Sequence, residues 1–263
     1  MAATYWHRQT PDSPLYPELE WLRPETRARG GRLLIVGGNH HSFRRVAESY
    51  EAAQKAQAGE IRVAVPDSLK PTLTHIIPEA EYVKSNASGG IGLDAENQLL
   101  AFAGWSQAVV VAGDMGRNSE TPQIMDKFIN RYSGLLAITA DALEATAFSY
   151  DHLLAREQTL LVCSLAQLQR IFKDTAQTTA ITSTIGVVKL VEALHELTAQ
   201  QPCALTVYYE NQLITALNGE VVTTPFKWQS DDPNWRVPVA TRQVTFWMQH
   251  AEAAFKALTF AQL

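Results

Sequence analysis

Short runs of apolar residues alternate with amphipathic segments along most of the chain. Residues 32–36 (RLLIV) form a β-rich run that ends at glycines, which is typical of a buried parallel strand leading into a loop. Residues 44–58 then repeat apolar positions at near-helical spacing before Gly59, and residues 61–65 form a second strand closed by Pro66. These segments predict a β-α-β unit with a right-handed crossover.

The same alternation continues through the middle of the chain. Thr121 followed by Pro122 predicts a helix start, with a hydroxyl cap and proline at the first helical position, and that helix runs to about residue 131. Further helices are expected over residues 93–103 and from about residue 141. Strands are expected over residues 108–112, 135–139 and 159–163.

The last third of the chain predicts a long helix, three strands and a final helix. The long helix is expected over residues 181–200, and the final one over residues 241–260. The strands are expected over residues 204–209, 213–217 and 221–224. Asn218-Gly219 between the last two is a strong hairpin signal. With no linker or internal repeat, we expect one α/β domain over residues 30–263.

Residues 1–29 are expected to form an N-terminal arm. They contain scattered prolines and charges and lack the uninterrupted apolar segment of a secretory signal. We interpret the arm as a lid or partner-binding segment, and the alternative is a partly disordered tail. The residues expected to anchor it are Trp6, Tyr16, Trp21 and Leu22.

Composition narrows the class of protein. The 22 Lys and Arg against 27 Asp and Glu give a net charge of −5, which disfavours a nucleic-acid partner. No run approaches the roughly 20 apolar residues that cross a bilayer, so no membrane association is expected. Two cysteines cannot build a disulfide framework or a cysteine-rich zinc site. We therefore expect a soluble, cytoplasmic protein.

Three segments should meet at the carboxyl ends of the strands, where sheets of this kind bind ligands. Glycines there let the backbone approach a ligand, although an ordinary tight loop explains them equally well. Asp141 could touch a ligand, but taken alone it is more typical of a helix cap. The candidate ligand-binding residues are Gly37, Gly38, Asn39, His40, Gly113, Met115, Gly116, Asn118 and Asp141.

No metal site is expected from the adjacent His40 and His41. Neighbouring side chains should point apart, and no third ligand is evident.

The order GGN, AGDMGRNSET and TADAL resembles the ADP- or ATP-dependent NAD(P)H-hydrate dehydratases, which have the ribokinase-like fold. Residues 112–118 stand where that family has a GPGLGRN-type turn, and residues 139–143 where it has a DADAL-type segment. Residues 52–66 are also similar to a family helix and strand, so the resemblance covers roughly residues 31–172. It implies a three-layer α/β/α fold with a mostly parallel sheet and a C-terminal hairpin.

The resemblance also implies a chemistry. The hydroxyl of a hydrated nicotinamide cofactor is phosphorylated and phosphate then leaves, which requires a general base and a backbone anion cradle. The cofactors implied are ADP or ATP with magnesium and an NAD(P)H-related substrate. The family places its base and cradle in a late GGSGD-type turn that opens a helix.

The chain departs from this pattern in its second half. The late turn should fall near residues 240–246, which contain neither glycine nor Asp, so Arg242 and Gln243 would crowd the phosphate. The TPHPGE-type segment is replaced by residues 162–167, where Ser164 and Gln167 predict a capping box. The lysine-glycine nucleotide segment is replaced by residues 207–210. Asp114 could serve as a substitute base.

Two functions remain open. One is a dehydratase-like or small-molecule kinase enzyme whose nucleotide-dependent reaction is weak or lost, and the other is a non-catalytic ligand-binding, regulatory or assembly module that needs no cofactor. A homo-oligomer is expected. An aromatic group could stack a base or nicotinamide ring, but is more typical of core or a subunit contact. It consists of Phe226, Trp228, Trp235, Phe246 and Trp247.

Overall fold

The computed structural model describes residues 4–228 and 234–263, and over these residues the strands form one ten-stranded sheet. Its order is β1-β10-β9-β8-β7-β6-β5-β2-β3-β4. The strands are β1 (Trp6–Arg8), β2 (Arg32–Gly37), β3 (Glu60–Pro66), β4 (Ala80–Val83), β5 (Ala108–Gly113), β6 (Leu135–Thr139), β7 (Thr159–Cys163), β8 (Ala204–Tyr209), β9 (Gln212–Leu217) and β10 (Glu220–Pro225). From β8 to β4 every neighbouring pair is parallel, whereas β9 runs antiparallel to both β8 and β10.

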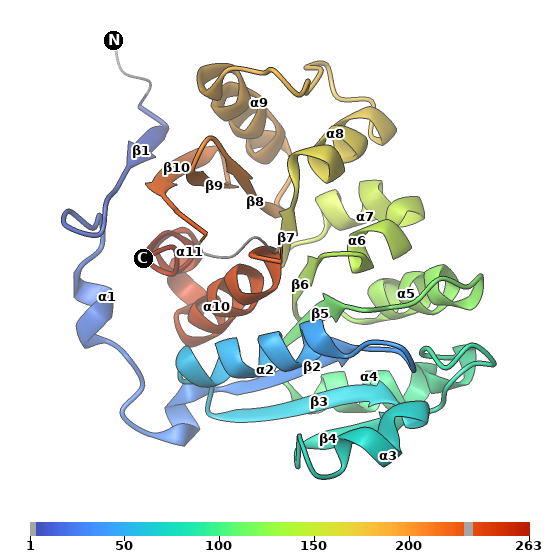
Figure 1. Cartoon of the computed structure of the whole chain (residues 1–263). Helices are drawn as coiled ribbons and strands as arrows, with labels where there is room; N and C mark the ends of the chain where they lie inside the picture. The colour runs from blue at the N-terminus through green and yellow to red at the C-terminus, as the bar shows by residue number, and fades with distance from the viewer. Residues whose placement is uncertain (1–3, 229–233) are drawn as a thin grey trace.

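Helices cover both faces of this sheet, which confirms the predicted three-layer α/β/α architecture (Figure 1). The first face carries α2, α3, α10 and α11, and the second carries α4 to α9. The helices are α1 (Glu18–Trp21), α2 (Arg44–Lys55), α3 (Lys70–Leu73), α4 (Glu96–Trp105), α5 (Glu120–Arg131), α6 (Ala142–Ala145), α7 (Tyr150–Ala155), α8 (Leu165–Asp174), α9 (Val187–Gln200), α10 (Arg236–Gln249) and α11 (Ala254–Phe260).

The central strands read as continuous apolar runs because both of their faces are buried. In β2, Leu33 and Ile35 pack into the layer of α2 and α10, while Leu34 and Val36 pack into the opposite layer. Successive side chains of a strand point to opposite faces, so a run without polar residues is stable only where both faces are covered.

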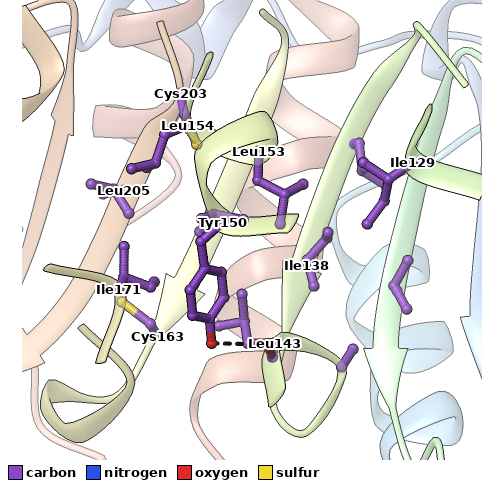
Figure 2. Close-up of a cluster of buried hydrophobic side chains, with 14 of the residues drawn as sticks. Ile129, Ile138, Leu143, Tyr150, Leu153, Leu154, Cys163, Ile171, Cys203 and Leu205 are labelled. Carbon is purple, nitrogen blue, oxygen red and sulfur yellow. Dashed lines mark hydrogen bonds between the residues drawn. The ribbon is translucent and has the colours of Figure 1, made fainter. Parts of the chain in front are cut away.

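Tyr150 lies in the cluster that joins α7 to the sheet (Figure 2). Its ring packs among Leu153, Ile138 and Cys163, and its hydroxyl donates a hydrogen bond to the carbonyl oxygen of Leu143 at 3.0 Å. Burial of the ring raises the pKa of Tyr150 to about 12. The single polar atom of this side chain is therefore satisfied inside an apolar layer.

The last predicted helix is two helices with different bounds. Helix α10 begins at Arg236 and ends at Gln249, and α11 follows after residues 250–253. Pro238 marks the earlier start, because proline is tolerated in a first turn whose N–H groups need no intrahelical acceptor. Residues 240–246 therefore lie inside α10. The prediction that the late turn falls near these residues is wrong.

Other predicted boundaries shift by a few residues. Helix α9 begins at Val187 instead of residue 181, with Gly186 as its N-cap, and α4 is displaced to Glu96–Trp105. Helix α5 is capped by the Asn118 side chain, whose Oδ1 accepts from the N–H groups of Glu120 and Thr121. The hairpin prediction is confirmed: Asn218 and Gly219 both have positive φ and join β9 to β10.

The N-terminal segment contributes an edge strand to the sheet. Strand β1 pairs in parallel with β10, and Trp6 donates its indole N–H to Thr223 Oγ1 at 3.2 Å. Tyr16 packs beside α11, but Trp21 is 87% exposed and Leu22 is 58% exposed. The last two side chains therefore do not anchor the segment. In the described part of the chain, no helix is long and apolar enough to span a membrane.

Both cysteines should be unreactive in the folded protein. Cys163 and Cys203 are fully buried, and burial raises the pKa of the Cys163 thiol to about 12 and that of Cys203 further still. The raised pKa keeps the folded thiols protonated, so their contribution to stability is present below roughly pH 8.5, the ordinary cysteine pKa, and is lost as the pH rises towards 12.

We therefore expect an aromatic disulfide reagent at pH 8 to label neither thiol in the native protein and to label both in denaturant. Rapid labelling of the native protein would contradict the burial.

Candidate functional site

The loops that follow β2 and β5 lie against each other at the carboxyl edge of the sheet. Gly38 donates its N–H to the carbonyl oxygen of Gly113 at 3.0 Å, and Asn39 Nδ2 donates to the carbonyl oxygen of Asp114 at 2.6 Å. The Asn39 Oδ1 accepts from the His41 N–H at 2.8 Å. The sequence prediction that these two segments meet is therefore correct.

The glycines permit this contact between loops. A Cβ on Gly37 would collide with the carbonyl oxygen of Gly113, and a Cβ on Gly113 would lie 2.5 Å from Asp141 Oδ1. Gly116 is less confined, since its nearest neighbour would be the Asn39 side chain at 3.6 Å. Gly37 and Gly113 are thus explained by protein packing, as in an ordinary tight loop, without any ligand.

The carboxylate of Asp114 is bound to the start of α2. Its Oδ2 accepts from the N–H of Arg45 at 2.8 Å, and its Oδ1 lies 3.3 Å from Arg45 Nη1. Asp114 is 7% exposed and has a φ of 56°. This arrangement satisfies an N–H in the first turn of α2 and places a negative charge at the positive end of the helix dipole.

Asp141 bridges three groups at the end of β6. Its Oδ1 accepts from the N–H of Asp114 at 2.8 Å and from Arg45 Nη1 at 2.6 Å, and its Oδ2 accepts from the N–H of Met115 at 3.0 Å. Its side chain forms no hydrogen bond with the N–H groups of α6. The helix-cap interpretation is therefore wrong, because the neighbouring turn supplies the donors instead.

A second polar group lies at the start of α8. Ser164 and Gln167 form the predicted capping box, so that prediction is confirmed. The side chain of Gln167 also accepts from Arg236 Nη1 at 2.6 Å and donates to Glu144 Oε1 at 2.7 Å. Burial lowers the pKa of the Arg236 guanidinium, while the charge of Glu144 opposes that shift and the charge of Arg45 adds to it. Two arginines therefore lie close together at this edge.

The loop of residues 84–92, after β4, was missed in the sequence. His40 donates its N–H to the carbonyl oxygen of Gly89 at 2.9 Å, and Asn118 Nδ2 donates to Ser88 Oγ at 2.9 Å. The loop thereby contacts both of the other loops. The available signal was Gly89-Gly90, a glycine pair that follows a short strand.

Two further candidates have constrained roles. The Met115 side chain is 1% exposed and packs in the core, so its backbone N–H is what faces the site. The rings of His40 and His41 lie edge to face with centroids 5.2 Å apart instead of pointing apart. Within residues 4–228 and 234–263, no group of three His, Cys, Asp or Glu could hold a metal ion.

Residues 240–246, where the late turn was expected, lie inside α10. Thr241 is fully buried and its hydroxyl is 2.8 Å from that of Ser49 in α2, while Phe246 packs against Phe260 with ring centroids 5.5 Å apart. Trp235 instead adjoins Phe226 at the start of α10. The predicted aromatic group is therefore divided along the length of α10.

Comparisons with known proteins agree with this fold. No protein-family profile matches the chain. A bifunctional NAD(P)H-hydrate repair enzyme from Methanothermobacter thermautotrophicus is 25% identical over 126 residues, which is 47% of this chain and 24% of the relative. The match thus spans about a quarter of the relative's length.

Solved structures cover nearly the whole chain. A ribokinase-like superfamily protein from Enterococcus faecalis has a TM-score of 0.71 at 14% identity, covering 100% of this chain and 88% of its own. The ADP/ATP-dependent NAD(P)H-hydrate dehydratase from Bacillus subtilis, co-crystallised with ATP and Mg²⁺, has a TM-score of 0.65 at 14% identity, covering 94% and 85%. The fold is therefore ribokinase-like, and the resemblance to NAD(P)H-hydrate dehydratases is confirmed as a similarity.

Replacing Asp141 should destabilise the protein more than replacing an exposed Asp. Asp141→Ala leaves the N–H groups of Asp114 and Met115 without their acceptor and removes the shorter of the two carboxylate contacts of Arg45, so we expect a loss of about 2–3 kcal/mol in the free energy of unfolding. Asp141→Asn, which keeps one acceptor oxygen, should lose less. The matched control is Asp94→Ala on an exposed residue, expected to change stability by less than about 0.5 kcal/mol.

Urea unfolding of the three variants and the parent protein measures these differences. Equal stability of Asp141→Ala and Asp94→Ala would contradict the bridging role.

Proposed function

We propose that this protein binds a small organic ligand at the carboxyl edge of the sheet and that its nucleotide-dependent dehydration is weak or lost. The ligand class is a nucleotide, ADP or ATP with magnesium, or an NAD(P)H-related compound. The similarity to an NAD(P)H-hydrate repair enzyme and the ribokinase-like fold support this class. The segments after β2, β5 and β6 meet at Asp114 and Asp141, and they lie where open α/β sheets bind ligands.

The observation that carries the proposal is the engagement of Asp114. A general base needs a free carboxylate oxygen within hydrogen-bond reach of the substrate hydroxyl. Both oxygens of Asp114 instead contact Arg45, and the residue is nearly buried. Asp114 is therefore better suited to fixing α2 than to accepting a proton.

The start of α10 gives further support. Its described residues, Asn234, Trp235 and Arg236, include no glycine, and residues 229–233 lie outside the described part of the chain. Trp235 is 6% exposed, and Arg236 is held by Gln167. These residues supply a cation that attracts a phosphate, but not the small residues from which a close backbone cradle is built.

Within the described residues, the carboxylates at this edge do not fit a magnesium ion bound directly by the protein. Asp114, Asp141 and Glu144 each accept hydrogen bonds from neighbouring side chains or N–H groups. Magnesium prefers carboxylates that remain open to it, together with water and phosphate oxygens. Asp114, Asp141 and Glu144 therefore leave the ion to be held by the phosphates of a nucleotide.

We expect this protein to bind a ligand of this class while turning over the hydrate of NADH slowly or not at all. Thermal unfolding is followed in the presence of ADP, of ATP with magnesium, or of NADH, each added singly. A ligand at one hundred times its dissociation constant adds roughly 2.7 kcal/mol to the free energy of unfolding. NADH formation from its hydrate is followed by absorbance, with the B. subtilis dehydratase in parallel. Because a general base contributes about 10²–10⁴-fold, we expect turnover at least about 100-fold lower than in that enzyme.

Substitution of Asp114 tests whether this residue acts as the general base. Asp114→Asn should lower the thermal midpoint while leaving any residual turnover of the still-folded protein within about twofold. Turnover equal to that of the B. subtilis enzyme, abolished in Asp114→Asn, would overturn the proposal. Ligand-induced stabilisation with no NADH formation at all would favour the non-catalytic module.

A further inference from the structure

A cavity of about 220 Å³ lies where the N-terminal segment meets α2 and α10. Arg23 lines it from the segment after α1, Lys55 from the end of α2, and Arg242 from the middle of α10. On α2 it begins at Ala52, seven residues after Arg45, which corresponds to about 10 Å along the helix. On α10 the lining begins at Pro238, two residues after Arg236, and none of the lining residues belongs to the site proposed above.

The charges around this cavity are unbalanced. Its lining includes three cations and no carboxylate. Glu20, just outside, accepts from Arg23 Nη2 at 2.8 Å, which leaves a net charge of about +2. Like charges gathered in this way repel one another unless an anion joins them.

The two arginines are only partly satisfied by the protein. Arg23 Nε is buried and has no acceptor among the described residues. No residue in the described part of the chain forms a hydrogen bond or ion pair with the Arg242 guanidinium, which lies 5.8 Å from the ring centroid of Phe246. Burial lowers the pKa of Arg242 and the charge of Arg23 lowers it further, while the charge of Glu20 opposes this shift. Both observations point to a missing negative partner.

Apart from Gln57, the remaining lining residues are apolar. Ala52, Ala56 and Phe246 are buried residues that line the cavity, together with Pro238 from the first turns of α10. An inorganic anion alone would leave these walls without a partner, whereas a small organic group would cover them. The volume limits that group to a few heavy atoms or a single ring.

We infer that this cavity is a second binding site, for a small organic phosphate whose dianionic group joins Arg23, Arg242 and Lys55. A phosphate monoester carries a charge of about −1.5 to −2 at neutral pH, which matches the excess positive charge. Its oxygens pair with guanidinium groups in the bidentate geometry that arginine favours. The organic group lies against Phe246 and the alanines of α2.

Phenyl phosphate is the probe, and calorimetry on the full chain at low ionic strength is the measurement. We expect saturable binding of one molecule per chain, at least about tenfold tighter than inorganic phosphate, because only the ester covers the apolar walls. Arg23→Gln and Arg242→Gln should each weaken binding by at least about tenfold. Arg170→Gln, which removes an exposed arginine on α8, should change it by less than about twofold.

Thermal midpoints distinguish lost binding from lost folding. Lys55→Gln changes an exposed residue, so it tests the site even if Arg242→Gln does not fold. It should weaken phenyl phosphate binding by about threefold or more. The proposal is overturned by an absence of phenyl phosphate binding, by equal affinity for inorganic phosphate, or by binding that survives in the folded Arg23 and Lys55 variants. An equal loss in Arg170→Gln would also overturn it, since net charge alone would then explain the binding.

Discussion

The carboxylate of Asp141 is the interaction on which the carboxyl edge of this protein depends. It holds the backbone of Asp114 and Met115 and the guanidinium of Arg45, and thereby joins the end of β6 to the loop after β5 and to the start of α2. Gly113 has to lack a side chain for this approach, since a Cβ there would reach the Asp141 oxygen. One carboxylate and one glycine thus determine how three segments meet.

In this arrangement the charged side chains at the carboxyl edge bind other groups of the protein. Asp114 neutralises the start of α2, and Glu144 reaches Arg236 through Gln167. Open α/β sheets bind small molecules at this edge, and a general base has to keep a carboxylate oxygen free for its substrate. Among the described residues, these charged groups are therefore engaged by the protein itself.

Helices α2 and α10 run side by side over the same face of the sheet (Figure 1). Each starts at the carboxyl edge, with Arg45 in one and Arg236 in the other, and each leads to the positively charged cavity. The buried hydroxyl pair of Ser49 and Thr241 joins them midway. Because a buried hydrogen-bonded pair requires a defined geometry, Ser49 and Thr241 help to determine how the two helices lie against each other.

The sequence determined the alternation of strands and helices, the meeting of the GGN, AGD and TAD segments, the Ser164 capping box and the Asn218-Gly219 hairpin. The helices, strands, capping box and hairpin depend on residues close together in the chain, whereas the meeting of the three segments follows because parallel strands end at one edge of the sheet. Only the tertiary structure decided what Asp141 binds, that α10 begins at Arg236, and that Arg45, Arg236 and the loop of residues 84–92 belong to the site. The contacts of Asp141, Arg45, Arg236 and the loop of residues 84–92 join residues tens of positions apart, where local propensity carries no information about which donor reaches which acceptor.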